Sequence, residues 1–365
     1  MDADQILAFR LARSGLAAWD GRSLVEAAAC PVSDFSRDAA LIALGARVEG
    51  LSREAYDRAV DAGEVVVAHV IRGAIHAVAP GDFGLYGRAL IAADDRELGP
   101  QLGQQVQRLA AEHGFSAGEA LEEVAAATQD ALADGRALDK NELHQALRER
   151  VRDELLPWCR GCESYHVAPM MWRYATVKAG VRLDARRRYT RGVPRPPLPA
   201  SSEAVRRFLG FYGPAGPGDF GEWAGLAKPH ARRLWDEVAG DLTEVRVGKT
   251  KAWLLSEDLP ALESPPTADG IRLIPPGDPY LQKPSRPLLT PDPELRKRLF
   301  RPVASPGAVL SGGRLAGLWR AKAKGRKAEI SVEQIDRLPR AGLEEEAQRV
   351  AHLRGAAEAA LVVDR

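Results

Sequence analysis

Residues 211–226 constrain the fold of this chain more than any other stretch of its sequence. They read Phe-Tyr-Gly-Pro-Ala-Gly-Pro-Gly-Asp-Phe-Gly-Glu-Trp-Ala-Gly-Leu. The apolar spacing over 201–212 predicts an amphipathic helix that ends at Gly213 and Pro214, because neither residue continues a helix well. A second short helix is expected to open at Asp219, whose side chain suits a helix N-cap.

The residues that follow complete a recognisable motif. The sequence predicts a third helix over 228–238 and then two strands within 244–255. Gly248 and Lys249 provide the turn between these strands. Three short helices followed by a hairpin indicate a winged helix, a helix-turn-helix variant whose usual partner is duplex DNA. Lys249 and Lys251 on this hairpin are therefore candidate DNA contacts.

A similar pattern occurs near the N-terminus. A second hairpin is expected over 65–78, with Arg72 and Gly73 in its turn, so Arg72 is a further candidate DNA contact. Four helices are predicted before it, over 4–19, 23–29, 36–48 and 52–62.

The rest of the chain is predicted to be mainly helical and then β-rich. We expect helices over 100–113, 117–133 and 141–158, the edge of a further wing at 164–169, a meander over 308–332 around Gly312 and Gly313, and a closing helix over 343–354. The predicted class is mainly α (α+β), with tandem winged-helix modules. The expected divisions are a first winged helix at 1–95, a helical or second winged-helix module at 96–190, a Pro-rich linker at 191–200, a third winged helix at 201–260, and a β-meander with its closing helix at 261–365.

Composition indicates an ordinary soluble protein. The chain has 365 residues, of which 45% are hydrophobic and 28% are charged. No apolar run is long enough to span a bilayer, and the first residues lack the pattern of a signal peptide. Three cysteines do not make a disulfide framework. We therefore expect a cytoplasmic monomer with no membrane partner.

The distribution of charge is more informative than the net charge of +1. Acidic residues concentrate in 119–134 and 344–358. Basic residues form three clusters elsewhere, namely Arg182, Arg186, Arg187, Arg188, Arg191 and Arg195; Arg296, Lys297, Arg298 and Arg301; and Arg320, Lys322, Lys324, Arg326 and Lys327. Any one cluster is compatible with a solvated loop. All three beside winged-helix patterns favour contact with DNA phosphates.

Five segments occur in an order that resembles a known family. They are residues 72–76, 212–214, 219–226, 273–281 and 313–320, which read Arg-Gly-Ala-Ile-His, Tyr-Gly-Pro, Asp-Phe-Gly-Glu-Trp-Ala-Gly-Leu, Leu-Ile-Pro-Pro-Gly-Asp-Pro-Tyr-Leu and Gly-Arg-Leu-Ala-Gly-Leu-Trp-Arg. In this they resemble the tandem winged-helix family that includes the AlkZ-type bacterial DNA glycosylases. The resemblance covers essentially the whole chain. It implies winged helices arranged around duplex DNA, excision of alkylated or crosslinked purines, and no metal or organic cofactor.

The catalytic pattern of that family is altered here. Glycosylases of the family carry Gln-hydrophobic-Gln or Gln-hydrophobic-Asp, whereas residues 30–39 read Cys-Pro-Val-Ser-Asp-Phe-Ser-Arg-Asp-Ala and contain no glutamine. Ser33, Asp34 and Ser36 are the polar residues nearest the pattern, and Asp34 is the one with base character. The competing interpretation is that Ser33 and Asp34 cap a helix over 35–48.

His76 is the fourth catalytic candidate. It ends a predicted strand of the hairpin over 65–78, where it can contact DNA or line a lesion pocket. The alternative is a strand histidine that is half-buried and hydrogen-bonded to backbone.

Cys159, Cys162 and His166 have the spacing of metal ligands. A zinc site needs a fourth ligand, which would have to come from His144 or Cys30, far away in sequence. A thioredoxin-like redox motif needs a βαβ context, which is lacking. We therefore expect two small cysteines in a turn and no stoichiometric zinc.

Taken together, these patterns predict a protein that binds duplex DNA. The leading prediction is a DNA-repair glycosylase that hydrolyses the N-glycosidic bond of alkylated or bulky purine adducts. The alternative is a non-catalytic winged-helix DNA-binding protein, either a transcription regulator or an adduct-binding resistance protein.

Overall fold

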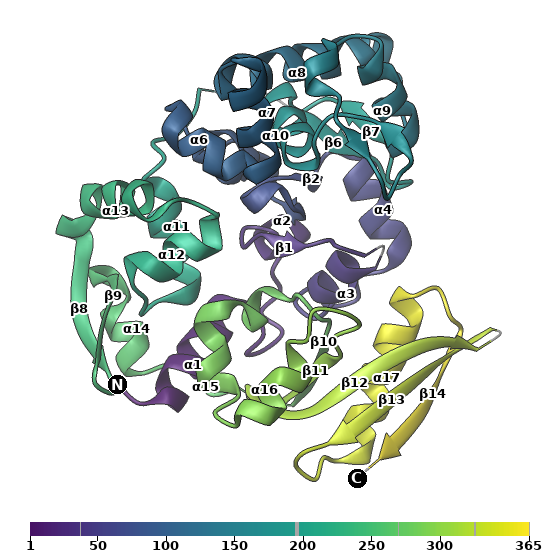
Figure 1. Cartoon of the computed structure of the whole chain (residues 1–365). Coiled ribbons are helices and arrows are strands. Elements are labelled where there is room, and N and C mark those ends of the chain that lie inside the picture. Colours follow the sequence, from purple (N-terminus) through teal and green to yellow (C-terminus); the bar gives the residue numbers. More distant parts are fainter. Residues whose placement is uncertain (37, 194–196, 269, 325, 365) are drawn as a thin grey trace. The chain divides into compact units, whose positions relative to one another are not determined.

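The chain folds into two compact units, each built from segments that are separated in the sequence. The computed structural model describes residues 1–36, 38–193, 197–268, 270–324 and 326–364 (Figure 1). The first unit comprises Met1–Asp57, Arg206–Asp219 and Val238–Arg365, and the second comprises Arg58–Val205 and Phe220–Glu237. Three helices cross from one unit to the other, namely α4 (Arg53–Ala62), α11 (Glu203–Tyr212) and α12 (Pro217–Ala224).

A five-stranded sheet dominates the first unit. Its strands, in spatial order, are β10 (Ile271–Ile274), β11 (Gly307–Ser311), β12 (Arg314–Lys324), β13 (Lys327–Gln334) and β14 (Glu358–Asp364). The first four pair in antiparallel fashion, which confirms the predicted meander around Gly312 and Gly313. Gly313 has a φ of 79°, and a Cβ there would lie 2.7 Å from Cδ2 of Leu11, so both backbone and packing require glycine.

The last element of the chain corrects a prediction. The expected closing helix is present as α17 (Arg340–Leu353), but β14 follows it and pairs in parallel with β13, with Ile330 opposite Leu361. Parallel neighbours need a long crossover, and α17 supplies it. Residues 358–360 are glutamate and alanine, so local propensity favours a strand only over Leu361, Val362 and Val363, which is too short a stretch to predict one.

Helix α17 also provides hydrogen-bond partners for the backbone of β10, the strand at one edge of the sheet. The Leu273 amide donates a hydrogen bond of 2.7 Å to the Glu346 carboxylate, and Arg349 donates one of 2.9 Å to the Leu273 carbonyl. A sheet edge is otherwise open to pairing with other chains. These two side chains therefore close the β10 edge at Leu273.

Buried Arg10 explains the Tyr-Gly-Pro segment. Arg10 lies on α1 (Ala3–Arg13) and donates hydrogen bonds to the carbonyls of Gly213, at 3.2 Å, and Pro214, at 2.8 Å. These carbonyls follow the end of α11 at Tyr212, as predicted. Burial lowers the pKa of Arg10 to about 10. Helix α11 therefore ends at the predicted point, and the guanidinium of Arg10, which is far away in sequence, fixes the turn that follows.

A second buried arginine explains the segment at 273–281. Arg47 and Asp278 form an ion pair with nitrogen–oxygen distances of 2.8 Å, and both side chains are at most 1% exposed. Arg47 also donates to the carbonyls of Ser14 and Ala43, each at 2.7 Å. Because four of its five N–H donors are hydrogen-bonded and a carboxylate balances its charge, this pair meets the conditions under which a charge is tolerated in a core.

Helices and one short hairpin complete the first unit. The remaining elements are α2 (Leu24–Ala27), β1 (Val32–Ser33), α3 (Ala39–Gly45), β8 (Leu242–Val247), β9 (Thr250–Leu255), α14 (Leu259–Glu263), α15 (Arg286–Leu289) and α16 (Pro293–Leu299). Strands β8 and β9 pair around Gly248 and Lys249, which confirms the predicted hairpin.

The second unit is mainly helical around a small sheet. Its helices are α5 (Phe83–Tyr86), α6 (Asp95–Leu102), α7 (Gln104–His113), α8 (Ala117–Ala131), α9 (Lys140–Arg148), α10 (Pro169–Ala179) and α13 (Lys228–Glu237). In its sheet, β3 (Ile75–Val78), β2 (Val66–His69), β6 (Val181–Leu183) and β7 (Tyr189–Arg191) are successive neighbours. The strands β4 (Trp158–Cys159) and β5 (Ser164–Tyr165) form a separate ribbon.

The predicted hairpin at Arg72 and Gly73 is present. Both residues have a positive φ, 57° and 61°, as a tight turn between β2 and β3 allows. All four residues of β2 are buried, and Val67 also pairs with Leu183 of β6. This hairpin is therefore an interior part of its sheet, unlike a projecting wing.

Two helix predictions in the second unit need correction. The helix expected over 141–158 ends at Arg148, and β4 begins ten residues later, directly after Pro157, which cannot donate the helical hydrogen bond. Helix α10 was not predicted, because it is apolar on several faces and lacks a clear period. It packs on α8.

The three helices expected around residues 201–238 are all present as α11, α12 and α13. Their winged-helix arrangement and the five predicted divisions of the chain remain predictions. Residues 194–196 of the predicted linker, Arg195 among them, lie outside the described residues. In the part of the chain that the structure describes, no helix is long and apolar enough to cross a membrane.

Candidate functional site

The predicted catalytic segment lies at the start of α3. Ser33 is half-buried on β1, and Asp34 follows it with an exposed fraction of 3%. Oδ1 of Asp34 accepts a hydrogen bond of 3.3 Å from the Ala40 amide in the first turn of α3. The helix begins at Ala39, later than predicted, so Asp34 caps it from outside. The capping interpretation therefore holds for Asp34 alone, because the N-cap position of α3 is Asp38 and Ser33 lies on β1.

The residues after Asp34 face solvent and border a hollow. Phe35 is 59% exposed, and Ser36 is exposed beside it. Both line a cavity of about 210 Å³, together with Trp319 and Arg320 of β12. Asp34 itself does not line this cavity. An aromatic ring and a guanidinium around one hollow suit a flat ring that stacks, such as a nucleobase.

This cavity continues into two neighbouring hollows of about 440 and 380 Å³. The hollows of 210 and 380 Å³ share Phe35, Pro276 and Ser305. The hollows of 210 and 440 Å³ share Trp319 and Arg320, and those of 440 and 380 Å³ share Arg301 and Pro306. We call the three together the arginine groove, because its arginines are Arg286, Arg298, Arg301, Arg320 and Arg354. Arg286 and Arg354 are not part of the basic clusters in the sequence, so clustering of basic residues does not predict them.

Two arginines of the groove converge on a single carbonyl. The Ala304 oxygen accepts hydrogen bonds from Arg301, at 2.6 and 2.8 Å, and from Arg320, at 2.9 Å. Within the described residues, neither guanidinium makes an ion pair with a carboxylate. Partial burial and the neighbouring Arg301 lower the pKa of Arg320. Glu333 also lines the groove, but it pairs with Arg298, so two neighbouring cations that are not in ion pairs are left and are suited to binding an anion.

The other predicted basic residues of this region differ in their partners. Arg298 pairs with Glu333 at 2.5 Å, and exposed Lys297 pairs with Glu294 at 2.8 Å. Arg296 instead donates to the Thr290 carbonyl at 2.6 Å, at the end of α15. Two further lysines lie on β12: Lys322, which is exposed, and Lys324, whose side chain lies outside the described residues. Among Arg296, Lys297 and Arg298, Arg296 is tied to backbone and does not line the groove.

Arg186, Arg187 and Arg188 of the second unit occupy the turn between β6 and β7, and Arg191 ends β7. Arg186 and Arg191 are exposed, Arg187 has a φ of 63°, and Arg188 pairs with Asp184 at 2.8 Å. The turn therefore presents several cations in a short stretch.

The two hairpins offer different basic residues. In the second unit, Arg72 donates a hydrogen bond of 2.5 Å to the Trp223 carbonyl of α12, so it joins two parts of that unit. In the first unit, Lys249 and Lys251 are exposed on the β8–β9 hairpin, and Lys251 pairs with Glu244 at 3.1 Å.

His76 is buried in β3 of the second unit. Its exposed fraction is 3%, and Nδ1 lies 3.0 Å from the Ala74 carbonyl. Burial lowers its pKa to about 4, so the ring is neutral at neutral pH. This environment matches the structural interpretation of His76, with greater burial than expected. The residue belongs to a different unit from Asp34.

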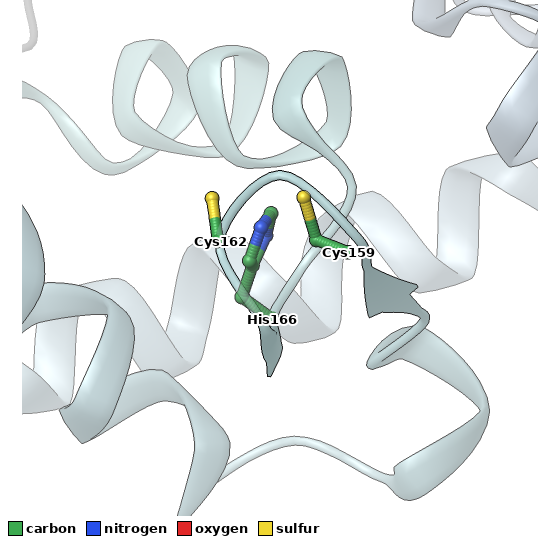
Figure 2. A group of neighbouring side chains, drawn as sticks. All are labelled: Cys159, Cys162 and His166. Carbon is green, nitrogen blue, oxygen red and sulfur yellow. The ribbon is translucent and has the colours of Figure 1, made fainter.

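Cys159, Cys162 and His166 come together in the turn between β4 and β5 and just after it. In Figure 2, the imidazole of His166 lies between the two cysteine side chains. Their ligand atoms all lie within 4.8 Å of one another. A hydrogen bond with His166, and further ones within the turn, lower the pKa of the Cys159 thiol to about 7. Cys30 differs: it is buried 3.5 Å from the Tyr212 hydroxyl, and its pKa is raised to about 12.

Known proteins resemble this chain in sequence and in fold. An interstrand DNA cross-link repair glycosylase from Streptomyces sahachiroi is 32% identical over 165 residues, a match that spans 44% of each protein. The solved structure of the Streptomyces sahachiroi DNA glycosylase AlkZ superimposes with a TM-score of 0.78 at 23% identity and covers both chains completely. This similarity establishes a shared fold of mixed helices and strands.

A family model described as DNA glycosylase AlkZ-like matches residues 33–353, which include Asp34, the Arg47–Asp278 pair and four of the five arginines of the arginine groove. The chain belongs to the AlkZ-like DNA glycosylase family.

Proposed function

We propose that this protein binds duplex DNA through tandem winged-helix modules and excises alkylated or bulky purine adducts. One observation carries the proposal. Within the first unit, the segment that takes the place of the family's catalytic pair borders a hollow with an exposed aromatic ring, Phe35, and an arginine, Arg320.

The chemistry needs little from the protein. An N7-alkylated purine is cationic and leaves readily, so the main requirement is to stabilise the positive charge that develops on the sugar and to position a water. Asp34 is a carboxylate directly before the groove segment, and a fixed negative charge at short range serves this purpose. Ser33 and Ser36 are hydroxyls that suit orientation of a water. His76, neutral by burial, is a weaker candidate for this role.

Phosphate binding is assigned to the arginine groove. Arg301 and Arg320 share the Ala304 carbonyl and have no carboxylate partner among the described residues, which leaves their positive charge for an anion. Lysines and arginines on turns, such as Arg186 and Lys249, add contacts that do not depend on sequence.

A second candidate function has a specific observation in its favour. Asp34 is 3% exposed, caps α3 and does not line the hollow. A carboxylate that serves mainly as a cap, with no glutamine nearby, is compatible with a protein that binds adducts without cleaving the glycosidic bond.

An excision assay separates the two functions. The substrates are labelled duplexes that contain one N7-methylguanine or one crosslinked purine, with an undamaged duplex as the control. For a glycosylase, mild alkali treatment after incubation breaks the strand at the resulting abasic site to a greater extent than in the same damaged duplex incubated without protein. If damaged duplex is retained in a binding assay but stays intact, the protein is a binder. If neither duplex is bound at low salt, both proposals are wrong.

A further inference from the structure

The turn between β4 and β5 in the second unit has unused metal-ligating chemistry. Cys159 and Cys162 flank Arg160 and Gly161, a C-x-x-C spacing in a tight turn, and His166 follows. The three ligand atoms lie within 4.8 Å of one another (Figure 2). None of these residues contributes to the proposed excision chemistry.

The tautomer of His166 is set by its neighbour. Nδ1 of His166 lies 2.8 Å from the Val167 carbonyl, to which it can donate only when it carries the proton. Nε2 is buried and then has a lone pair available, and the neighbour with which it interacts is the Cys159 thiol. A ring nitrogen fixed in this way through its other nitrogen is the common arrangement for histidine ligands of metals.

The fold brings a second histidine to the same place. His144 on α9 has its ring 5.1 Å from the ring of His166, and its Nδ1 is buried without a partner among the described residues. The same cavity, of about 460 Å³, is lined by His144, Cys159, Cys162 and His166. Buried polar atoms without partners usually have a reason, and an ion is one.

We propose that these four residues form a Cys2His2 site for Zn²⁺. Zinc takes sulfur and nitrogen ligands in a tetrahedron, and with zinc–sulfur bonds of about 2.3 Å its ligand atoms lie about 3.8 Å apart. Among Cys159, Cys162 and His166 the present separations, up to 4.8 Å, exceed this by about the movement that side-chain rotation in a turn provides. His144 completes the set from α9, with its ring 5.1 Å from that of His166.

Charge and proton balance favour this composition. Zinc binding displaces one proton from each thiol into solvent, so two thiolates and two neutral imidazoles around Zn²⁺ give a complex with no net charge. Such a complex suits a partly buried turn. Hard cations such as Mg²⁺ and Ca²⁺ prefer oxygen ligands, so they are excluded by this ligand set.

The site has a structural purpose. Strands β4 and β5 contain two residues each, which is too short to hold a hairpin by backbone pairing. A metal bound by the turn and by His144 fastens this ribbon to α9. The His144 ring also lies 4.6 Å from the ring of Trp172, so the attachment extends to α10.

The test uses the full chain purified without chelator and without metal-affinity resin. Elemental analysis is expected to find one zinc per chain. After removal of the metal, titration with Co²⁺ is expected to give the absorption of a tetrahedral site with thiolate-to-cobalt charge transfer, saturating at one equivalent. These measurements use the unmodified sequence and so do not depend on the folding of a variant.

Variants then assign the ligands. Cys162→Ser and His144→Ala should each lower the zinc content at least tenfold after dialysis, and Cys162→Ser should weaken the charge-transfer band. Cys30→Ser is the matched control, because this cysteine is buried against Tyr212 in the first unit, and it should retain one zinc. Native-state circular dichroism verifies folding of each variant.

Three outcomes would overturn the proposal. The first is zinc content well below one per chain together with a Co²⁺ spectrum that lacks thiolate bands. The second is full zinc retention in Cys162→Ser. The third is a Cys159–Cys162 disulfide in protein purified under reducing conditions, which would assign the turn to redox chemistry.

Discussion

Arg47 and Arg320 have the same side chain and lie in the same unit, but they differ in two respects. Arg47 is 1% exposed, and the Asp278 carboxylate, 2.8 Å away, neutralises it. Arg320 lines a hollow, donates to the Ala304 carbonyl and has a second arginine as its neighbour. Arg47, buried and paired with a carboxylate, has a structural role. Arg320 lies in a hollow and is not paired with a carboxylate, so its charge is available to an anion from outside.

The largest expected effect is on the buried pair. Arg47→Ala leaves the Asp278 carboxylate buried and unpaired, so the free energy of unfolding should fall by about 3–5 kcal/mol. Urea denaturation measures this change. Arg340→Ala, which removes an exposed pair with Glu344, is the control and should cost less than about 1 kcal/mol. Equal costs for the two variants would contradict the distinction between the sites.

Buried His76 tests the case of an ionisable group without a carboxylate partner. Its pKa in the folded protein is about 4, against an ordinary value of 6.5, so the unfolded chain binds the proton first. Its contribution to stability is therefore full above pH 6.5 and is lost as the pH falls from 6.5 to 4. A shift of about 2.5 pH units corresponds to about 3 kcal/mol.

The measurement is the urea midpoint across that pH range, for the natural sequence and for His76→Gln. The variant should show a shallower acid dependence. Some dependence will remain, because burial also lowers the pKa of His69 to about 3. Identical pH profiles for the two proteins would mean that His76 is not buried as described.

Asp34 shares features of both arginines, since it is buried yet lies beside the groove. If it stabilises the charge of the transition state, Asp34→Asn should keep the cap on α3, because asparagine caps about as well as aspartate. Stability and duplex affinity should barely change, while excision should slow by on the order of 10²-fold. Single-turnover rates on an N7-alkylguanine duplex provide the measurement. A variant as fast as the natural sequence would reduce Asp34 to a structural cap.

The smallest effects are expected at the groove itself. Arg301→Ala and Arg320→Ala should each weaken duplex binding severalfold and reduce the slope of log affinity against log salt by about one, as the loss of a single phosphate contact does. Fluorescence anisotropy at several salt concentrations measures both quantities. Arg298→Ala is the control, because that side chain is already paired with Glu333, and it should change the slope less. A larger effect at Arg298 would reverse the comparison.

Local signals predicted much of the fold. The Gly-Pro end of α11, the turns at Gly73 and Gly248, and the meander around Gly312 all rest on residues whose backbone preferences act within a few positions. The capping role of Asp34 is of the same kind. These features appear where the sequence places them, although α3 begins at Ala39.

Long-range features were out of reach. Strand β14 depends on β13 as a template, and α10 has no apolar period that distinguishes it from a loop or a strand. The fourth ligand of the proposed zinc site illustrates the same limit. The sequence offers His144 and Cys30 as candidates for a fourth ligand, but it does not show that either lies near Cys159. The prediction from the sequence is therefore that no zinc is bound. Only the packing of α9 beside the β4–β5 turn brings their side chains to one cavity.

The first unit is assembled from both ends of the chain, and this has a consequence for synthesis. Its segment Met1–Asp57 leaves the ribosome before Val238–Arg365, which contains Asp278 and the whole five-stranded sheet. At roughly 5–20 residues per second, the intervening chain delays the partners by roughly 10–40 s. During that time Arg47 and the apolar face of α1 lack their final contacts. The nascent N-terminal segment is thus a natural client for chaperones, and a truncated message would yield an unfinished first unit beside a second unit whose segments are already complete.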